Sequence, residues 1–375
     1  MSIAQIAAEA LERAGGTFID PPVLLEAKVP LELSGEAVRA RICTFVDQAG
    51  QEWALRPDLT LVVAQAEVSA RIAGANGDLV RRYRGPVFRL PVNSNDPVEY
   101  DQVGLERFGA ARSVDEDVWL FQTLAEVTQT CGVESGHASF GDLSVFPAFV
   151  DALGFAPDTA AGLKRAFRQA GGVRAYLDGQ DRHERGLSSR LSGMDREEIA
   201  DFVDDIFAMT SVRPVGERRS DEIVERLHAR AKSTVGSDLT KAQRAILENV
   251  LSLDVTLREA PQALASIARE GGLADLDEML EQFPERTEKI LSSPQSELVQ
   301  SARFATRFGR RFTYYDGFVF EIAIDEKPDS KSQPLVAGGR YDSLLSDLSS
   351  GAVSATALGG VIIPHRIARA TGAQI

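Results

Sequence analysis

The sequence predicts an α+β fold whose strands are interrupted by a helical insertion. Three observations lead to this prediction. Residues 1–156 mix strand-like alternation with amphipathic helices, residues 157–302 carry Ala, Leu, Arg, Asp and Glu at helical spacing, and strand-like segments return over residues 303–375. Strands at both ends of a chain with helices between them favour one domain built by both ends, so we expect domain boundaries at 156/157 and 302/303.

The first segment is predicted to alternate helices and strands. Gly15 and Gly16 stop an N-terminal helix, and Pro21 and Pro22 place the next strand at an edge, since proline cannot donate to a ladder. A turn-like interval at 48–51 separates two extended runs and predicts a β-hairpin. In order, we expect a helix at 1–14, a strand at 17–27, a hairpin at 40–58, a helix at 59–74, strands at 81–92 and 98–109, a helix at 114–131 after Ser113 as N-cap, and a strand, turn and helix over 137–154.

The rest of the chain is predicted to be helical and then extended. Residues 157–302 fit several short helices joined by Gly, Ser and Pro loops. An extended run then begins near 310, a polar turn follows at 325–334, and a second run contains Gly338 and Gly339. The segment 356–372 is a strand or loop that continues into a short helix.

Composition excludes several classes of protein. The 375 residues carry a formal charge of −14, which argues against nucleic acid as the main partner, because phosphate binding depends on clustered Lys and Arg. Two cysteines and four histidines have no metal-ligand spacing, and no phosphate-binding glycine loop occurs, so we expect no metal and no cofactor. The N-terminus is an amphipathic helix and no apolar run is long enough to span a membrane, which predicts a soluble cytoplasmic protein.

The first candidate site residues follow the hairpin. Asp58 could accept a hydrogen bond from an amine and Thr60 could cap the next helix, although an ordinary N-cap turn would use the same residue types. Arg89 ends an alternating strand, where its guanidinium could hold a carboxylate or phosphate. An exposed pair with a surface carboxylate is equally compatible with that position.

The next candidates share one face of a strand. Gln102, Gly104 and Glu106 lie at period two, so the amide and the carboxylate point the same way. If this face lines a cavity, it offers both groups to a cationic or hydrogen-bonding ligand, and Gly104 leaves room for that ligand. If the face is exposed, the residues are simply solvated.

The extended runs near the C-terminus supply the remaining candidates. Tyr314 and Tyr315 are adjacent, so in a strand their rings would point to opposite faces, although strand propensity alone would explain two aromatics. Gly338 and Gly339 precede Tyr341, which allows the backbone to approach a ligand closely. A Gly-Gly bulge beside a helix is the simpler explanation.

These motifs together resemble the catalytic core of histidyl-tRNA synthetase, over about 17–150 and 303–368. The order that carries the resemblance is a strand with Pro22, then RPDLT, YRGPVFR, DQVGLERFG, YYDGFVFE, GGRYD and LGGVIIPHR. The resemblance implies a class II aminoacyl-tRNA synthetase-like antiparallel sheet flanked by helices. It also divides the chain into core with motifs 1 and 2 (1–156), helical insertion (157–302), and core with the histidine motifs and a degenerate motif 3 (303–375).

The same resemblance assigns roles in a histidine pocket. Asp58 takes the position of the glutamate that holds the amino group, and Arg89 that of the motif 2 arginine. Gln102 and Glu106 match pocket residues. Arg310 falls near the arginine that serves adenylation. Tyr314, Tyr315 and Tyr341 match the pocket tyrosines, and Thr60 belongs to the RPDLT motif.

The departures from the synthetase pattern concern ATP and tRNA. Leu90-Pro91-Val92 replaces the His-Glu that orients ATP, and motif 3 reads Gly359-Gly360-Val361-Ile362-Ile363-Pro364-His365-Arg366, where Ile363 fills a space usually left by glycine. The chain ends nine residues beyond Arg366, which we expect to leave no room for an anticodon-binding domain. ATP chemistry and tRNA recognition are therefore both expected to be lost, while the histidine pocket is kept.

This combination resembles the family of ATP phosphoribosyltransferase regulatory subunits, which are synthetase paralogues. The resemblance implies a protein that makes no product itself, that assembles with a short catalytic subunit into a hetero-octamer around a homodimer core, and that confers feedback inhibition by histidine in histidine biosynthesis. No nucleic acid and no membrane are expected as partners. The alternatives are a truncated ligase that activates histidine for an acceptor other than tRNA, and a stand-alone histidine-binding module.

Overall fold

The computed structural model describes residues 1–91, 97–169, 172–178, 194–210, 224–225, 227, 239–309, 314–324 and 333–373. These residues form two compact units. The first contains Met1–Val145 and Asn249–Ile375, and the second contains Phe146–Glu248. The first unit holds the sheet and all the candidate site residues that the structure describes.

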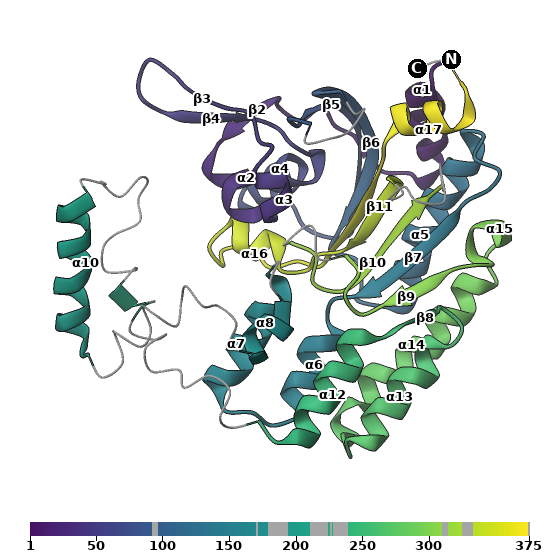
Figure 1. Ribbon diagram of the computed structural model, residues 1–375. Helices are drawn as coiled ribbons and strands as arrows, with labels where there is room; N and C mark the ends of the chain where they lie inside the picture. The colour runs from purple at the N-terminus through teal and green to yellow at the C-terminus, as the bar shows by residue number, and fades with distance from the viewer. Residues whose placement is uncertain are drawn as a thin grey trace. The chain divides into compact units, whose positions relative to one another are not determined.

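A nine-stranded, mostly antiparallel sheet forms the centre of the first unit (Figure 1). Only the pairs β1–β5 and β7–β9 are parallel among the described strands. This arrangement confirms the α+β fold with a largely antiparallel sheet. In sheet order the strands are β1 (Thr17–Phe18), β5 (Leu79–Phe88), β6 (Glu99–Phe108), β12 (Ala357–Ile362), β11 (Pro334–Arg340), β10 (Phe318–Ala323), β7 (His137–Asp142), β9 (Arg303–Ala305) and β8 (Asp254–Thr256).

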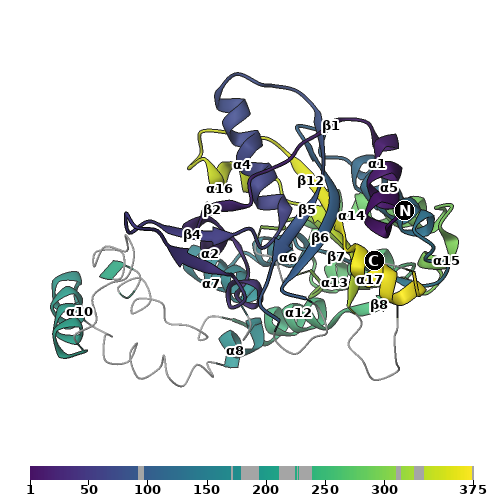
Figure 2. The ribbon, with the colours of Figure 1, turned by 90° about the horizontal axis from the view of Figure 1, so that it is seen from above.

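Helices cover both faces of this sheet. Figure 2 shows α4 on one side of β5 and β6, with α1 and α5 on the other side. Since both faces are covered, the central strands are buried on both sides, as the almost continuous burial of β6 and β11 indicates. The helices of the first unit are α1 (Ile3–Leu11), α2 (Lys28–Leu33), α3 (Glu36–Arg39), α4 (Leu59–Ile72), α5 (Val114–Thr130), α13 (Ala260–Glu270), α14 (Asp277–Leu291), α15 (Ser296–Val299), α16 (Leu344–Leu348) and α17 (Pro364–Thr371), with short 3₁₀ turns at Glu12–Ala14 and Ala274–Leu276.

Local sequence signals explain where the main helices begin. Ser2 and Gln5 form a capping box at the start of α1, and the Ser113 side chain accepts from the Glu116 N–H at the start of α5, as its sequence predicts. Between α5 and the sheet, Phe121 packs edge-to-face against Phe140 and Phe320, with ring centroids 5.1 and 5.2 Å apart. These contacts fix α5 against β7 and β10.

A second, three-stranded sheet has the order β2 (Leu24–Glu26), β4 (Glu52–Leu55) and β3 (Thr44–Val46). The predicted hairpin is the β3–β4 pair, and the Asp47 side chain accepts from the backbone of Ala49 and Gln51 within its turn. The predicted strand at 17–27 is divided into β1 and β2, because residues 19–23 with their two prolines leave the main sheet and enter the small one.

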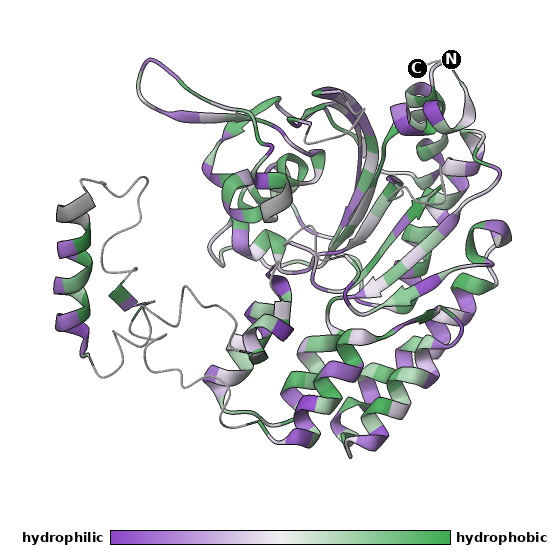
Figure 3. Cartoon of the chain, in the orientation of Figure 1, coloured by the Kyte–Doolittle hydropathy of each residue, from purple (hydrophilic) through white to green (hydrophobic). Residues whose placement is uncertain are grey.

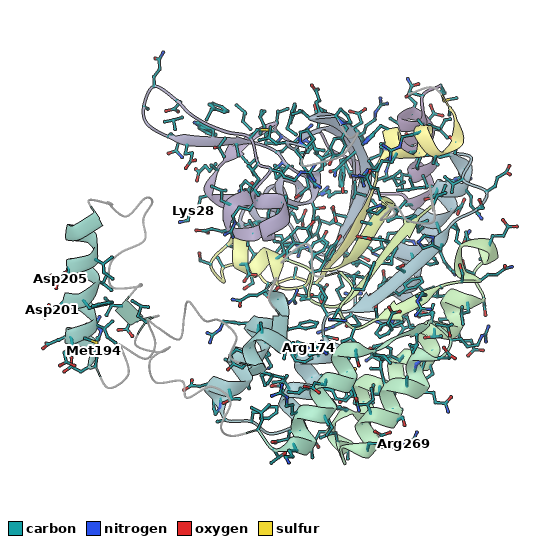
Figure 4. The ribbon with its side chains drawn as sticks, in the orientation of Figure 1. Lys28, Arg174, Met194, Asp201, Asp205 and Arg269 are labelled. Atoms are coloured by element: carbon teal, nitrogen blue, oxygen red, sulfur yellow. The ribbon has the colours of Figure 1, made fainter. Side chains whose placement is uncertain are left out.

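The second unit consists of helices in its described residues. They are most of α6 (Val145–Ala152) and α12 (Lys241–Ser252), with α7 (Pro157–Arg168), α8 (Gly172–Asp178) and α10 (Arg196–Thr210). Figure 3 shows hydrophobic and hydrophilic faces on α10, and in Figure 4 Asp201 and Asp205 lie on the same side of that helix. Ile199 and Val203 on its apolar face pack with Val224. The faces follow from helical periodicity.

Three predictions about elements were wrong. The segment at 157–302 is not helical throughout, since β8 adds a strand to the edge of the main sheet. The Gly338-Gly339 pair forms no bulge, because both residues lie in regular register between β10 and β12. Strand β10 begins at Phe318 rather than near 310, and residues 310–313 lie outside the described part. The predicted division at 156/157 and 302/303 stays a prediction about domains.

Candidate functional site

The centre of the candidate site is the Glu106 carboxylate on β6. Its Oε1 accepts from the Thr60 hydroxyl and from the Tyr83 hydroxyl, both at 2.7 Å, and its Oε2 accepts from the Tyr341 hydroxyl. Glu106 has no exposed surface. The predicted face of Gln102 and Glu106 is therefore buried rather than solvated.

The neighbouring glycines make room for this carboxylate rather than for a ligand. A Cβ at Gly104 would overlap the Tyr83 hydroxyl and the Gly360 carbonyl, and a Cβ at Gly359 would overlap Glu106 itself. The prediction that Gly104 leaves space for a ligand was wrong, because Tyr83 from β5 occupies that space. The glycines let three elements meet on one side chain.

Burial changes the titration of Glu106. The loss of solvation raises its pKa to about 7, while hydrogen bonds from Tyr341, Thr60 and Tyr83 oppose the rise and the nearby Asp58 adds to it. A pKa raised this far by burial marks Glu106 as a candidate functional residue.

Asp58 caps the helix that carries Thr60. Its Oδ1 accepts from the Leu61 N–H at 3.0 Å, which makes Asp58 the N-cap of α4. The prediction that Thr60 caps the helix was wrong, since its hydroxyl donates to Glu106 instead. The other oxygen of Asp58, Oδ2, is buried and has no hydrogen-bond partner in the described part of the chain, and burial raises the pKa of this carboxyl. A buried acceptor in this state is suited to a donor from outside the protein.

Gln102 and Arg89 hold the start of α4. The Gln102 Oε1 accepts from the Leu59 N–H at 3.1 Å, and the Arg89 Nε donates to the Pro57 carbonyl at 2.5 Å. Both side chains are at most 8% exposed, so Arg89 does not form the exposed surface pair that the sequence left open. The Arg89 charge lies close enough to Asp58 to oppose the rise of its pKa.

Three tyrosines close the site. The rings of Tyr314 and Tyr315 lie 4.9 Å apart, and both pack near Tyr341, with centroids at 5.8 and 6.1 Å. The prediction that Tyr314 and Tyr315 point to opposite faces was wrong, because they precede β10 and do not follow strand alternation. All three are buried, and burial raises the pKa of each hydroxyl, so they act as neutral donors.

The tyrosine segments are fastened to each other through their backbones. The Asp316 carboxylate accepts from the N–H groups of Asp342 and Ser343, and the Asp316 N–H donates to the Arg340 carbonyl at 3.0 Å. The turn after Tyr315 is therefore hydrogen-bonded to the turn after Tyr341.

Other predicted features are placed less centrally or not at all. Arg366, the motif 3 arginine, donates from Nη1 to the Pro334 carbonyl at 2.8 Å and is buried. Arg310 lies outside the described residues, so no position is given for it. In the described ranges, no group of three His, Cys, Asp or Glu side chains is placed to hold a metal ion, and no helix has the length and apolar character needed to cross a membrane.

Sequence reasoning missed two side chains that shape the site. Tyr83 donates to Glu106. The feature that could have pointed to this contact is the position of Tyr83 opposite Gly104 on the neighbouring strand, which is known only once the strands are paired. Arg56 is 1% exposed and donates to the carbonyls of Pro21 and Pro86, which ties the proline segment to β5. An arginine before Asp58 was visible in the sequence, but nothing indicated that it would be buried.

Comparison with known proteins gives consistent results. The family model for histidyl-tRNA synthetase matches residues 2–201 and 198–360. The chain is 28% identical over 338 residues to an ATP phosphoribosyltransferase regulatory subunit from Chelativorans sp. (strain BNC1), covering 88% of this chain and 87% of the relative. It is 27% identical over 340 residues to the protein of that name from Agrobacterium fabrum, with the same coverage.

Solved structures share the fold. An ATP phosphoribosyltransferase regulatory subunit/histidyl-tRNA synthetase from Bacillus halodurans superposes with a TM-score of 0.61 at 19% identity, covering 98% of this chain and 78% of that one. The histidyl-tRNA synthetase from Nostoc sp. PCC 7120 gives a TM-score of 0.59 at 12% identity, covering 98% and 70%. These structures confirm the class II synthetase-like fold.

Proposed function

This chain belongs to the histidyl-tRNA synthetase family, and from that premise we propose that it is a regulatory subunit of ATP phosphoribosyltransferase. The observation that carries the proposal is the alignment with proteins of that name along nearly the whole of both chains. The chain acts in histidine biosynthesis without making a product itself, and a catalytic partner subunit carries the activity.

The ligand of the site is histidine. The Asp58 Oδ2 accepts from the amino group, because this buried oxygen has no hydrogen-bond partner among the residues that the structure describes. Glu106 accepts from the imidazole, and Thr60 holds the Glu106 carboxylate in place. Gln102 holds the start of α4, and Arg89 attracts the ligand carboxylate. Tyr314, Tyr315 and Tyr341 enclose the ring. Arg310 is a further candidate for the carboxylate.

Selectivity follows from burial. An apolar amino acid supplies the same ammonium group to Asp58, so the selectivity is assigned to Glu106. An apolar side chain gives this buried carboxylate no donor beyond its three hydroxyl partners, whereas the imidazole does. Feedback requires only that histidine binds one state of the complex better than another. A coupling free energy of about 1–3 kcal/mol between the pocket and the catalytic subunit is enough.

The assembly is a hetero-octamer with a short catalytic subunit, built around a homodimer of this chain. A largely apolar face of the small sheet supports the homodimer: Leu24 and Phe45 are 42% and 44% exposed, and Trp53 and Leu55 lie on the same face, together with the single charged residue Glu26. The charge of −14 supports the absence of nucleic acid as a partner. A cytoplasmic location is part of the proposal, because the regulated reaction uses ATP.

A steady-state assay of the catalytic subunit from the same organism tests the function. With this chain added, we expect a higher rate and inhibition by histidine. The Glu106→Gln variant removes the carboxylate assigned to the imidazole and is expected to weaken histidine inhibition at least about ten-fold, the effect of losing one charged hydrogen bond. Glu126→Gln on the exposed surface of α5 is the matched control and should behave as the wild type.

Two results would contradict the proposal. A catalytic subunit that ignores this chain at concentrations where both should assemble would remove the regulatory role. Histidine-dependent exchange between ATP and pyrophosphate by the chain alone would instead favour the truncated ligase.

A further inference from the structure

Four buried charged side chains form a continuous series of ion pairs on the sheet face opposite Glu106. Arg340 on β11 binds Asp117 on α5, with Nε and Nη2 at 3.0 and 2.8 Å from Oδ1. Arg286 on α14 donates to the Asp117 Oδ2 at 3.0 Å and to the Asp142 Oδ2 at 2.7 Å. The four residues are between 2% and 7% exposed. This series is hereafter the Arg340–Asp142 network.

The network leaves no carboxylate oxygen without a partner. The remaining oxygen of Asp142 accepts from the backbone and the hydroxyl of Ser144. The Arg286 guanidinium also lies 4.6 Å from the Phe283 ring centroid and 4.9 Å from that of Phe318. The Arg340 Nη1 also donates to the Asp342 Oδ1 at 3.3 Å, so a third carboxylate reaches the network, and these contacts hold the groups in place.

The network is one residue away from the site. Arg340 and Tyr341 are consecutive, and they reach opposite sides of the sheet: Arg340 contacts α5, whereas Tyr341 donates to Glu106 on the side of α4. The Arg340 carbonyl accepts from the Asp316 N–H, and a methyl group at Gly317 would lie 3.3 Å from the Arg340 Cδ. Arg340 therefore contacts both tyrosine-bearing segments of the site.

We propose that the Arg340–Asp142 network positions the Tyr341 hydroxyl on Glu106, and that Arg286 thereby links the pocket to helix α14. This inference rests on the proposed function and deepens it. It names the residues that set the affinity of the pocket for histidine, and it names α14 as the helix to which they connect the pocket. Buried ion pairs add little net stability compared with apolar packing, so stability alone does not account for three of them in series. Holding the Tyr341 hydroxyl in place requires ion pairs of fixed geometry, and these pairs have it.

The first test needs no ligand. The titration of Glu106 is followed by carbon-13 NMR of labelled glutamate, with the Glu106→Gln spectrum identifying its signal. Tyr341→Phe is expected to raise the Glu106 pKa by about 1 unit, because it removes a hydrogen bond to the charged form. Arg286→Lys keeps the charge but cannot bridge two carboxylates as a fork, so it should also raise this pKa. The variant that carries both Arg286→Lys and Tyr341→Phe should have the same Glu106 pKa as Tyr341→Phe alone.

Controls separate positioning from general destabilisation. Arg303→Lys alters a pair with Asp254 whose side chains are 54% and 60% exposed, and it should leave the Glu106 titration unchanged. If Arg286→Lys lowers the melting temperature but does not move the Glu106 titration, the network is only structural and the inference is wrong. If Arg286→Lys does not fold, Asp142→Asn, which keeps the shape of the side chain, is put through the same comparison.

Histidine binding gives the second test, by calorimetry. We expect Arg286→Lys as a single substitution to weaken histidine binding about ten-fold. Added to Tyr341→Phe, it should hardly weaken histidine binding further. Independent effects that add in the double variant would contradict positioning, because distant sites without shared partners are additive. A wild type that binds no histidine would contradict the proposed function, whereas the Glu106 titration would still decide the role of the network.

Discussion

Glu106 is completely buried and receives three hydroxyl hydrogen bonds, yet burial dominates its titration. The folded-state pKa of about 7 stands above the ordinary 4.5, so between these values the folded protein holds a proton that the unfolded chain has lost. Stability is therefore expected to decrease as the pH rises from about 4.5 to 7, by about 3 kcal/mol in total.

The measurement that checks this is the free energy of unfolding at several pH values in denaturant. The difference between the wild type and Glu106→Gln should fall by about 3 kcal/mol between pH 5 and 8, since only the wild type carries the titrating group. The difference between the wild type and Glu126→Gln should stay constant. A wild type whose advantage over Glu106→Gln grows with pH would show that the carboxylate is stabilised, not destabilised, by its site.

At the same scale, the sequence predicted candidate residues that the structure in part brings together, but it did not predict what each one contacts. Period-two alternation placed Gln102 and Glu106 on one face, and this was confirmed. The direct partner of Glu106 on β5, Tyr83, was missed because cross-strand neighbours depend on register, which one strand does not contain. The rings of Tyr314 and Tyr315 were assigned wrongly because alternation holds only inside a strand.

At the scale of elements, Asp58 has two roles: it stabilises helix α4, and it belongs to the pocket. Asp58 caps this helix with Oδ1 and presents Oδ2 to the site, so the two functions can be separated by substitution. Asn caps helices about as well as Asp, so Asp58→Asn should change stability by only a few tenths of a kcal/mol, while Asp58→Ala should cost about 1 kcal/mol. Both should weaken histidine binding, because both remove the charge that faces the amino group.

Thermal unfolding and calorimetric titration of the two variants check this prediction. Ser113→Ala, which removes the N-cap of α5 without touching the pocket, is the matched control. It should lose stability like Asp58→Ala and keep histidine binding. Normal binding by Asp58→Asn would mean that Asp58 is a cap and nothing more.

Elements with strong local signals were predicted well. The helices at 59–74 and 114–131 and the β5–β6 pair follow from periodicity, Ser113 and the turn residues between the strands. Strand β8 was missed, since three residues between helices carry no measurable alternation and become a strand only by pairing with β9. The course of residues 17–27 through two sheets was likewise set by tertiary contacts rather than by its own pattern.

For the whole molecule, the order of motifs was more informative than any single motif. Each of RPDLT, GPVFR and GGRYD has an ordinary structural explanation, but their sequence along the chain matches one fold, and solved structures of that fold superpose on this chain. The network on the far face of the sheet was not predictable, because Asp117, Arg286 and Arg340 come from three distant segments. Only folding brings these three charges together.

The homodimer is the last prediction, and it concerns the molecule as a whole. The small sheet has two faces: Leu25 and Ala54 are buried on one, while Leu24, Phe45, Trp53 and Leu55 form the other together with Glu26. Aromatic and aliphatic side chains that share an exposed face are typical of the centre of an interface. Leu24→Glu places a charge there, so we expect the dimer to dissociate into monomers in light scattering after gel filtration.

A control in the same sheet makes the result specific to one face. Val46 is 64% exposed but lies on the face of Ala54, opposite to Leu24, so Val46→Glu should remain a dimer. Circular dichroism should be unchanged in both variants, since neither side chain is buried. A monomeric wild type, or a dimer that survives Leu24→Glu, would place the contact between copies elsewhere. Loss of the dimer should also remove the response to histidine, because a hetero-octamer built on this dimer could not assemble from single chains.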